Sequence, residues 1–252
     1  NRSIELNQTP KRIVSLVPSQ TELLHDLGLD QELVGITKFC IHPKQWCGSK
    51  TKIGGTKDFK IEQILALKPD LIIANKEENE EGKLKELMKK FPVWVSDIHH
   101  LEDAIDMIHS IGAITAKKEK ASEIAKKITT NFKRLNPLAK RLKSLYLIWH
   151  NPSMSVNHST FISNMMEKCG FENIANTSIE YPALNAEDMQ ALKPELILLS
   201  SEPFPFKEKH IKIYQQQNPQ AKVLLVDGEA FSWYGSRLIN SPEYFISLKR
   251  TI

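Results

Sequence analysis

Short apolar runs alternate along the chain with stretches in which apolar residues recur every three or four positions. The first pattern is typical of buried strands and the second of amphipathic helices. Strands separated by helices favour parallel sheets with right-handed crossovers, so the sequence predicts an α/β fold with helices on both sheet faces. The expected strands are Ile13 to Val17, Leu33 to Thr37, Leu71 to Ala74, Val93 to Ser96, Ser144 to Trp149, Leu196 to Ser200 and Val223 to Asp227.

One stretch of this pattern occurs twice. The segments are KIEQILALKPDLIIA, Lys60 to Ala74, and NAEDMQALKPELILL, Asn185 to Leu199. They align without a gap at an offset of 125 residues, the difference between Lys193 and Lys68. Each copy indicates a short helix with a Glu near its start, a Lys-Pro break, an acidic residue and a buried strand. The duplication predicts two similar lobes.

A longer helical pattern lies between the two copies. Its apolar positions are Ala121, Ile124, Ala125, Ile128, Phe132 and Leu135. They predict one amphipathic helix over residues 115–136, ended by Pro137 and about 33 Å long. We therefore expect an N-terminal lobe of residues 1–114, a linking helix of residues 115–136 and a C-terminal lobe of residues 137–252. A rigid helical link predicts a ligand cleft between the lobes that changes little on binding.

Aromatic residues gather where the predicted strands end, which is where open parallel sheets bind ligands. They are Phe39, Trp46, Trp149, Phe204, Phe206, Phe231, Trp233 and Tyr234. Any one of them could instead be ordinary core. Loops usually favour polar turn residues, so the collection predicts aromatic walls for a large, flat, partly apolar ligand. Arg237, which follows FSWYGS, is expected either to supply a charge for a ligand carboxylate or phosphate, or to be a surface arginine.

The first strand is followed by PSQTELLHDLG, in which Ser19 and Glu22 have the spacing of a capping box. Two interpretations follow from this spacing. The segment is either an ordinary helix start or a helix start whose exposed N–H groups hold an anionic part of the ligand.

The stretch FCIHPKQWC raises the question of metal or disulfide chemistry. Three cysteines, Cys40, Cys47 and Cys169, are too few for a disulfide framework, and Cys40 with Cys47 is the local candidate for one bridge. Cys40 and His42 would face the same side of an extended segment, which makes them weak candidates for a metal site. His42 could otherwise make an axial or polar contact to a metal carried by the ligand.

Composition narrows the class of protein. With 41% hydrophobic residues, 25% charged residues and a net charge of +4, the chain has the composition of a soluble globular protein. The densest basic run, from Lys117, is interleaved with apolar residues at helical spacing, which favours a solvated helix face over a nucleic-acid site. No window of the sequence is apolar enough to span a membrane, so a soluble chain is expected. No familiar catalytic motif is present, so an enzyme is not expected. The start NRSIEL fits a processed or trimmed chain.

Taken together, the motifs resemble a known family. The stretches RIVSLVPSQTELLHDLGL, ELVGIT, IGGTKDFKIEQILALKPDLIIAN, MMEKCGFENI and YPALNAEDMQALKPELILL, with the linking helix, are similar to extracytoplasmic substrate-binding proteins of ABC importers that have a helical backbone. The vitamin B12-binding branch is the most similar, and the resemblance covers nearly the whole chain. It implies a monomer outside the cytoplasm that captures a chelate of cobalt or iron, has no intrinsic cofactor, and delivers its ligand to a permease dimer with an ATPase.

The resemblance also implies roles for individual residues. Glu62 and Glu187 fall where each lobe of the family presents an acid to permease arginines, and Tyr181 falls where an aromatic contacts the ligand. The vitamin-binding branch has tryptophans where this chain has Thr56 and Asn75. The most similar branch implies a cobalamin-type corrinoid first, and these two departures from it keep an iron-siderophore or haem next. The alternative is a metal-dependent enzyme or a zinc or manganese receptor that uses Cys40, His42 and second-lobe histidines.

Overall fold

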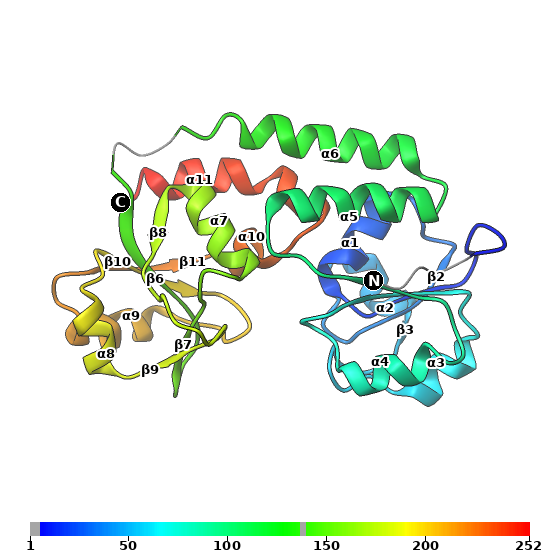
Figure 1. The fold of residues 1–252 in the computed structure, drawn as a ribbon, viewed down its shortest axis with the longest axis horizontal. Helices are drawn as coiled ribbons and strands as arrows, with labels where there is room; N and C mark the ends of the chain where they lie inside the picture. The colour runs from blue at the N-terminus through cyan, green and yellow to red at the C-terminus, as the bar shows by residue number, and fades with distance from the viewer. Residues whose placement is uncertain (1–5, 137–139) are drawn as a thin grey trace. The chain divides into compact units, whose positions relative to one another are not determined.

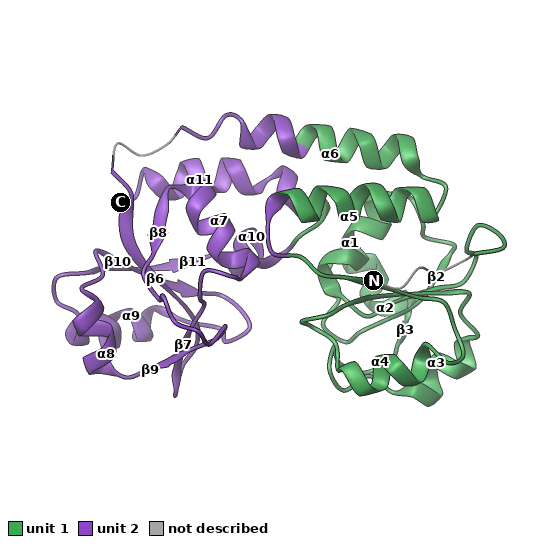
Figure 2. Cartoon of the chain, viewed as in Figure 1, with its two compact units in different colours: residues 1–98, 102–127, 234–237 green, residues 99–101, 128–233, 238–252 purple. Residues whose placement is uncertain are grey.

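The computed structural model describes residues 6–136 and 140–252, which form two compact units (Figure 2). Unit 1 contains residues 1–98, 102–127 and 234–237, and unit 2 contains residues 99–101, 128–233 and 238–252. The sequence predicted divisions at residues 114 and 136, whereas the two units divide after residue 127. Residues 99–101 belong to unit 2, and residues 234–237 belong to unit 1.

In unit 1, where Figure 1 labels strands β2 and β3, the strands form a parallel sheet with the order β3-β2-β1-β4-β5. Its strands are β1 (Ile13–Ser15), β2 (Leu33–Ile36), β3 (Thr51–Lys52), β4 (Leu71–Asn75) and β5 (Val93–Ser96). Its helices are α1 (Pro18–Asp26), α2 (Lys44–Ser49), α3 (Ile61–Leu67) and α4 (Glu81–Leu87), with most of α5 (Leu101–Ile114). Every residue of β1 and β4 is buried, as expected for central parallel strands.

Unit 2 has a mixed sheet with the order β11-β10-β6-β7-β9, and β8 pairs with β6. Its strands are β6 (Leu142–Trp149), β7 (Ser153–Ser155), β8 (Phe171–Asn173), β9 (Ala183–Leu184), β10 (Leu196–Ser200) and β11 (Lys222–Val226). Its helices are α7 (Phe161–Cys169), α8 (Ala186–Leu192), α9 (Glu208–Gln217), α10 (Gly228–Ser232) and α11 (Ser241–Lys249), with a 3-10 turn at Ser236–Ile239 that begins in unit 1. The α/β class is confirmed, although β7 adds antiparallel pairs with β6 and β9 that the sequence pattern did not predict.

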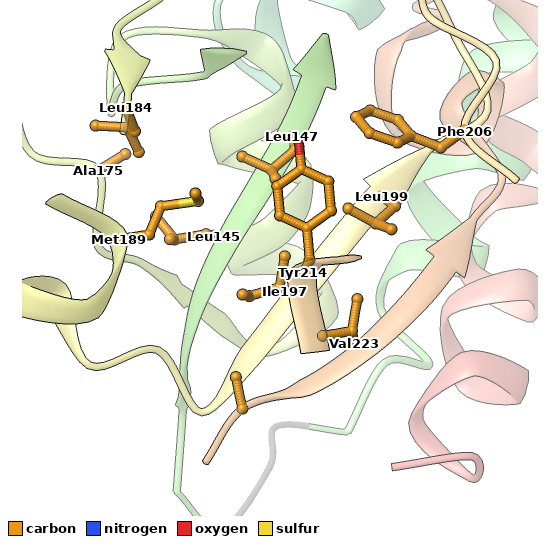
Figure 3. Close-up of a cluster of buried hydrophobic side chains, with 11 residues drawn as sticks. Leu145, Leu147, Ala175, Leu184, Met189, Ile197, Leu199, Phe206, Tyr214 and Val223 are labelled. Carbon is orange, nitrogen blue, oxygen red and sulfur yellow. The ribbon is translucent and has the colours of Figure 1, made fainter. Parts of the chain in front are cut away.

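The core of unit 2 fills the space between this sheet and its helices. Figure 3 shows Leu145, Leu147, Ile197 and Leu199 from β6 and β10 packed with Tyr214 of α9 and other buried residues. In unit 1 an equivalent cluster joins Val14, Ile72 and Phe59 to residues of α3 and α4.

The duplicated sequence adopts the same structure in both units. Helix α3 and strand β4 correspond residue for residue to α8 and β10 at the offset of 125. Lys68 and Lys193 both end their helices in the left-handed conformation, with φ of 46° and 50°. The proline that follows each lysine disfavours helical geometry at the lysine and starts the turn into the strand.

The acidic residue after each proline anchors the neighbouring strand. The Asp70 carboxylate accepts hydrogen bonds from the backbone N–H groups of Lys11 and Arg12 at 2.7 and 2.9 Å. The Glu195 carboxylate accepts one from the N–H of Lys143 at 2.9 Å. In this way the duplicated motif sets the register of the first strand in each unit.

The linking helix is shorter than expected. Helix α6 runs over Lys118–Phe132, and Ala116, with φ of 56°, separates it from α5. The N–H of Lys117 donates to the carbonyl of Gly112, a Schellman-type ending that closes α5 before α6 begins. Gly112 is required there, because an added Cβ would lie 2.3 Å from the Cβ of Ala121. Pro137, the expected end of the helix, lies outside the described residues.

Candidate functional site

The opening of α1 does not form the expected capping box. The helix begins after Val17, which makes no side-chain cap, and Ser19 lies buried in the first turn. Glu22 is instead the partner of Arg237, whose Nε and terminal nitrogen donate to the two carboxylate oxygens at 2.8 and 2.6 Å. Burial is the largest influence on Glu22 and raises its pKa, although Arg237 acts in the opposite direction.

Arg237 belongs to a four-residue segment, Tyr234 to Arg237, that packs with unit 1. The Tyr234 hydroxyl donates to the Glu78 carboxylate at 2.6 Å. Gly235 has φ of 142°, and an added Cβ would lie 3.0 Å from the Ser19 carbonyl oxygen, so glycine is needed at this close approach. We call residues 234–237 the return segment. In this structure Tyr234 and Arg237, both expected as ligand contacts, fasten it to α1 and to the loop after β4.

Trp46 was expected to line a cleft, but its side chain is only 2% exposed. Its indole N–H donates to Asp30, and its ring meets His25 edge-on with centroids 5.1 Å apart. The short helix α2 turns the tryptophan inward, which the sequence pattern gave no reason to expect. Phe39 is different, because 51% of its surface is exposed and the Lys38 ammonium lies 5.0 Å from its ring centroid.

The thiols of unit 1 are reduced in this structure. The Cys40 sulfur is buried and lies 3.1 and 3.2 Å from the hydroxyl oxygens of Thr21 and Thr37. Burial raises the pKa of this thiol. Cys47 contacts the Cys40 carbonyl oxygen at 3.3 Å, and both cysteines, like Cys169, are free. His42 is half-buried and close enough to Glu22 to help lower the pKa of that carboxyl.

Within residues 6–136 and 140–252, no group of three or more His, Cys, Asp or Glu side chains is arranged to hold a metal ion. Asn75, where the vitamin-binding branch has a tryptophan, is buried and donates to the carbonyl and hydroxyl oxygens of Ser96 at 3.2 and 3.1 Å. Its role in this structure is to join β4 to β5.

In unit 2, Trp149 ends β6 with 41% of its surface exposed. Its ring packs edge-on against that of Phe204, with ring centroids 5.6 Å apart. The ring of Phe204 in turn packs against that of Phe206, with centroids 4.9 Å apart. Both phenylalanines follow β10, so the carboxyl ends of two neighbouring parallel strands supply this surface. We call Trp149, Phe204 and Phe206 the aromatic platform.

Hydrogen bonds hold the base of the aromatic platform. The His150 ring lies 5.7 Å from that of Phe204, and its Nδ1 is 3.0 Å from the Tyr214 hydroxyl. The same hydroxyl lies 2.8 Å from that of Ser153. His210 accepts from the N–H of Lys207, and burial lowers the pKa of its imidazole, which favours the neutral ring. These contacts hold the rings around Phe204 in place and give the platform a defined orientation.

The other aromatics expected in unit 2 are mostly buried. Phe231 is fully buried, with its ring 5.3 Å from Tyr146 and 4.8 Å from Phe245, so it belongs to the core. Trp233 is nearly buried, and its indole N–H donates to Glu202 at 2.8 Å. Tyr181 is half-buried in the loop between β8 and β9.

Glu202 is a residue that the sequence did not single out. Its carboxylate also accepts from the Ser232 hydroxyl at 2.6 Å, and burial raises its pKa. Gly228 makes room for it, since an added Cβ would lie 2.6 Å from the Glu202 Cγ. An acidic residue before a proline in an aromatic loop, SEPFPF, was the only available signal.

Residues 13–226 match the family model described as "Periplasmic binding protein". The chain belongs to this family. The vitamin B12-binding protein of Vibrio parahaemolyticus is 28% identical over 200 residues, which are 77% of this chain and 72% of the relative. That of Pectobacterium carotovorum is 24% identical over 94% of this chain and 88% of its own length.

A solved structure with a similar fold is the periplasmic vitamin B12-binding protein BtuF of Vibrio cholerae. It aligns with a TM-score of 0.79 and 21% identity over 96% of this chain and 97% of its own. The resemblance to chelate-binding proteins of this family, stated from the sequence, is therefore confirmed. No described helix of this periplasmic binding protein is long and apolar enough to span a membrane.

Proposed function

We propose that this protein is the substrate-binding component of an ABC importer and acts outside the cytoplasm. Its ligand is a metal chelate, with a cobalamin-type corrinoid first and an iron-siderophore or haem next, and the metal belongs to the ligand. Support comes from the family, from relatives named for vitamin B12, and from the aromatic platform of unit 2, whose Trp149 is exposed.

The aromatic platform is the observation that carries the proposal. A tryptophan that is 41% exposed at the end of a central strand presents a large apolar face to solvent. Phe204 and His150 limit the motion of the surface beneath it, so binding loses little side-chain entropy. Such a surface suits a flat conjugated ring system, which gains from stacking as well as from burial.

The direct experiment compares ligands by thermal shift and absorption. Cobalamin, cobinamide, haem and a ferric siderophore are each added, with free zinc and manganese ions as controls. A ligand at about 100 times its Kd stabilises the folded state by roughly 2.7 kcal/mol, so the correct chelate raises the melting temperature by several degrees. The chelate proposal fails if only a free divalent ion raises the melting temperature.

Replacing Trp149 by alanine tests the platform itself. We expect W149A to bind the chelate roughly tenfold to a hundredfold more weakly, because a stacking aromatic surface is lost. Its melting temperature stays close to that of the parent, because the side chain is largely exposed. The control is Ile213→Ala, which removes an exposed apolar side chain from α9 of the same unit. Equal chelate affinities of W149A and the parent, measured by titration calorimetry, would show that Trp149 is not part of the binding site.

We further propose that Glu62 and Glu187 contact the permease. Both are exposed in the first turns of α3 and α8, at equivalent positions of the duplication. The double variant E62Q/E187Q should reduce cellular uptake of labelled chelate at least about tenfold. It should bind the chelate normally, because exposed charges at the edge of an interface act mainly on the association with the partner protein. The matched control is E86Q/E208Q, one exposed glutamate from each unit. Normal uptake by E62Q/E187Q would exclude these two residues as docking contacts.

A further inference from the structure

The positive charge of the chain is concentrated in one stretch. Residues 117–134 contain seven of the 34 Lys and Arg residues and two of the 30 Asp and Glu residues, a net charge of +5. The whole chain has a net charge of +4, so the remaining residues sum to −1. The excess therefore lies on α6 and the turn that follows it.

Helix α6 separates apolar and basic residues onto opposite faces. Ala121, Ile124, Ala125, Ile128 and Phe132 are buried. The exposed side of the second half of the helix carries Lys126 and Lys127, followed by Lys133 and Arg134 one to two turns later. We call these four residues the basic strip. Both acids of the stretch, Glu119 and Glu123, precede it, so the strip itself contains no negative charge.

The local structure gives a reason for only two of the four basic residues of the strip. Lys133 and Arg134 lie at the carboxyl end of α6, where cations complement the helix dipole. Lys126 and Lys127 lie before the last turn, where this effect is weak. Over the part of the chain that the structure describes, none of the four makes an ion pair. Their charges are therefore available to an external partner.

We propose that the basic strip binds the surface of a membrane that contains anionic phospholipid. The strip is an extended row of cations with Thr130 between them and without an aromatic residue on which a nucleic-acid base could stack. It also lacks an exposed apolar residue that could insert into the bilayer, so the contact is peripheral and purely electrostatic. This inference does not depend on which ligand the protein carries.

Vesicle co-sedimentation tests the proposal. The full chain is mixed with vesicles of phosphatidylcholine alone, or of phosphatidylcholine with an equal amount of phosphatidylglycerol. We expect binding only to the anionic vesicles, and we expect its loss at a salt concentration that shortens the Debye length to about 3 Å. Equal sedimentation with both vesicle types would overturn the proposal.

Charge-neutral variants locate the contact. K126Q/K127Q/K133Q/R134Q should weaken binding to the anionic vesicles by roughly tenfold or more, because each basic residue near such a surface contributes separately. The control K89Q/K90Q/K209Q/K212Q removes the same charge from exposed lysines of both units and should bind as the parent does. The charge-preserving K126R/K127R/K133R/R134K should also retain binding. Equal binding by the strip variant and the control variant would refute the assignment.

Two further measurements distinguish membrane binding from unfolding, from loss of chelate binding and from nucleic-acid binding. The strip variant should keep the parent's melting temperature and chelate affinity, which shows that lost sedimentation is not unfolding or failure of the proposed function. The parent and the strip variant are also titrated with a fluorescent single-stranded oligonucleotide. Strip-dependent binding to the oligonucleotide without binding to the anionic vesicles would replace the membrane with nucleic acid as the partner.

Discussion

Arg237→Met is expected to lower the free energy of unfolding by about 2 to 3 kcal/mol, because it leaves Glu22 without its counter-charge. The two side chains are 22% and 18% exposed, so the loss is smaller than for a fully buried pair. Urea unfolding of the parent and the variant measures the difference. The control E22Q/R237M removes both charges and should recover part of the loss, and no recovery would mean that the methionine itself disturbs the packing.

The same variant has a pH dependence with a definite sign. Burial already raises the pKa of Glu22 in the folded protein, and loss of Arg237 removes the main influence that lowers it. The folded state then binds a proton more tightly than the unfolded state, whose value is near 4.5. Stability therefore falls as the pH rises from the unfolded pKa through the folded pKa. The destabilisation by R237M should be larger at neutral pH than near pH 5, and a constant difference would contradict this account.

Trp46→Ala is expected to cost about 3 to 5 kcal/mol, the usual range for removing a buried tryptophan. The ring is enclosed by His25 and the Lys50 ammonium, which lies 5.2 Å from the ring, so alanine leaves a cavity in unit 1. Urea unfolding checks the size of the effect. W46F keeps most of the volume and should lose less.

The same pair of variants decides between packing and ligand contact at Trp46. If Trp46 only packs, W46F binds the chelate as tightly as the parent, whereas W149A does not. A stable W46F protein with strongly reduced affinity for the chelate would show that Trp46 contacts the ligand.

More of the fold than of the candidate site could be predicted from the sequence. The duplicated stretch predicted two equivalent helix-strand pairs, and α3 with β4 and α8 with β10 confirm it to the residue. Hydrophobic period and the Lys-Pro break are local signals, and both are strong there. The link was less predictable, because Ala116 adopts a left-handed conformation that ordinarily favours glycine or asparagine. The apolar spacing continues on both sides of that residue and conceals the break.

The candidate site was less predictable because strand-end aromatics look alike in a sequence. Trp46 comes after a strand and Trp149 ends one, yet the first is buried and the second is exposed. The difference depends on partners remote in sequence, Asp30 for the one and Phe204 for the other. Likewise, Arg237 could not be assigned to Glu22 without the fold, since the two residues are 215 positions apart. The ligand contacts and the permease contacts stay predictions.

The return segment makes unit 1 discontinuous in the gene. Tyr234 and Arg237 complete the hydrogen bonds of Glu78 and Glu22, but more than a hundred residues of the other unit are translated before them. During synthesis, unit 1 can therefore form these two contacts only after residues 234–237 have been made. A recombinant fragment that stops at residue 127 lacks both contacts, so a cut at that boundary removes part of unit 1.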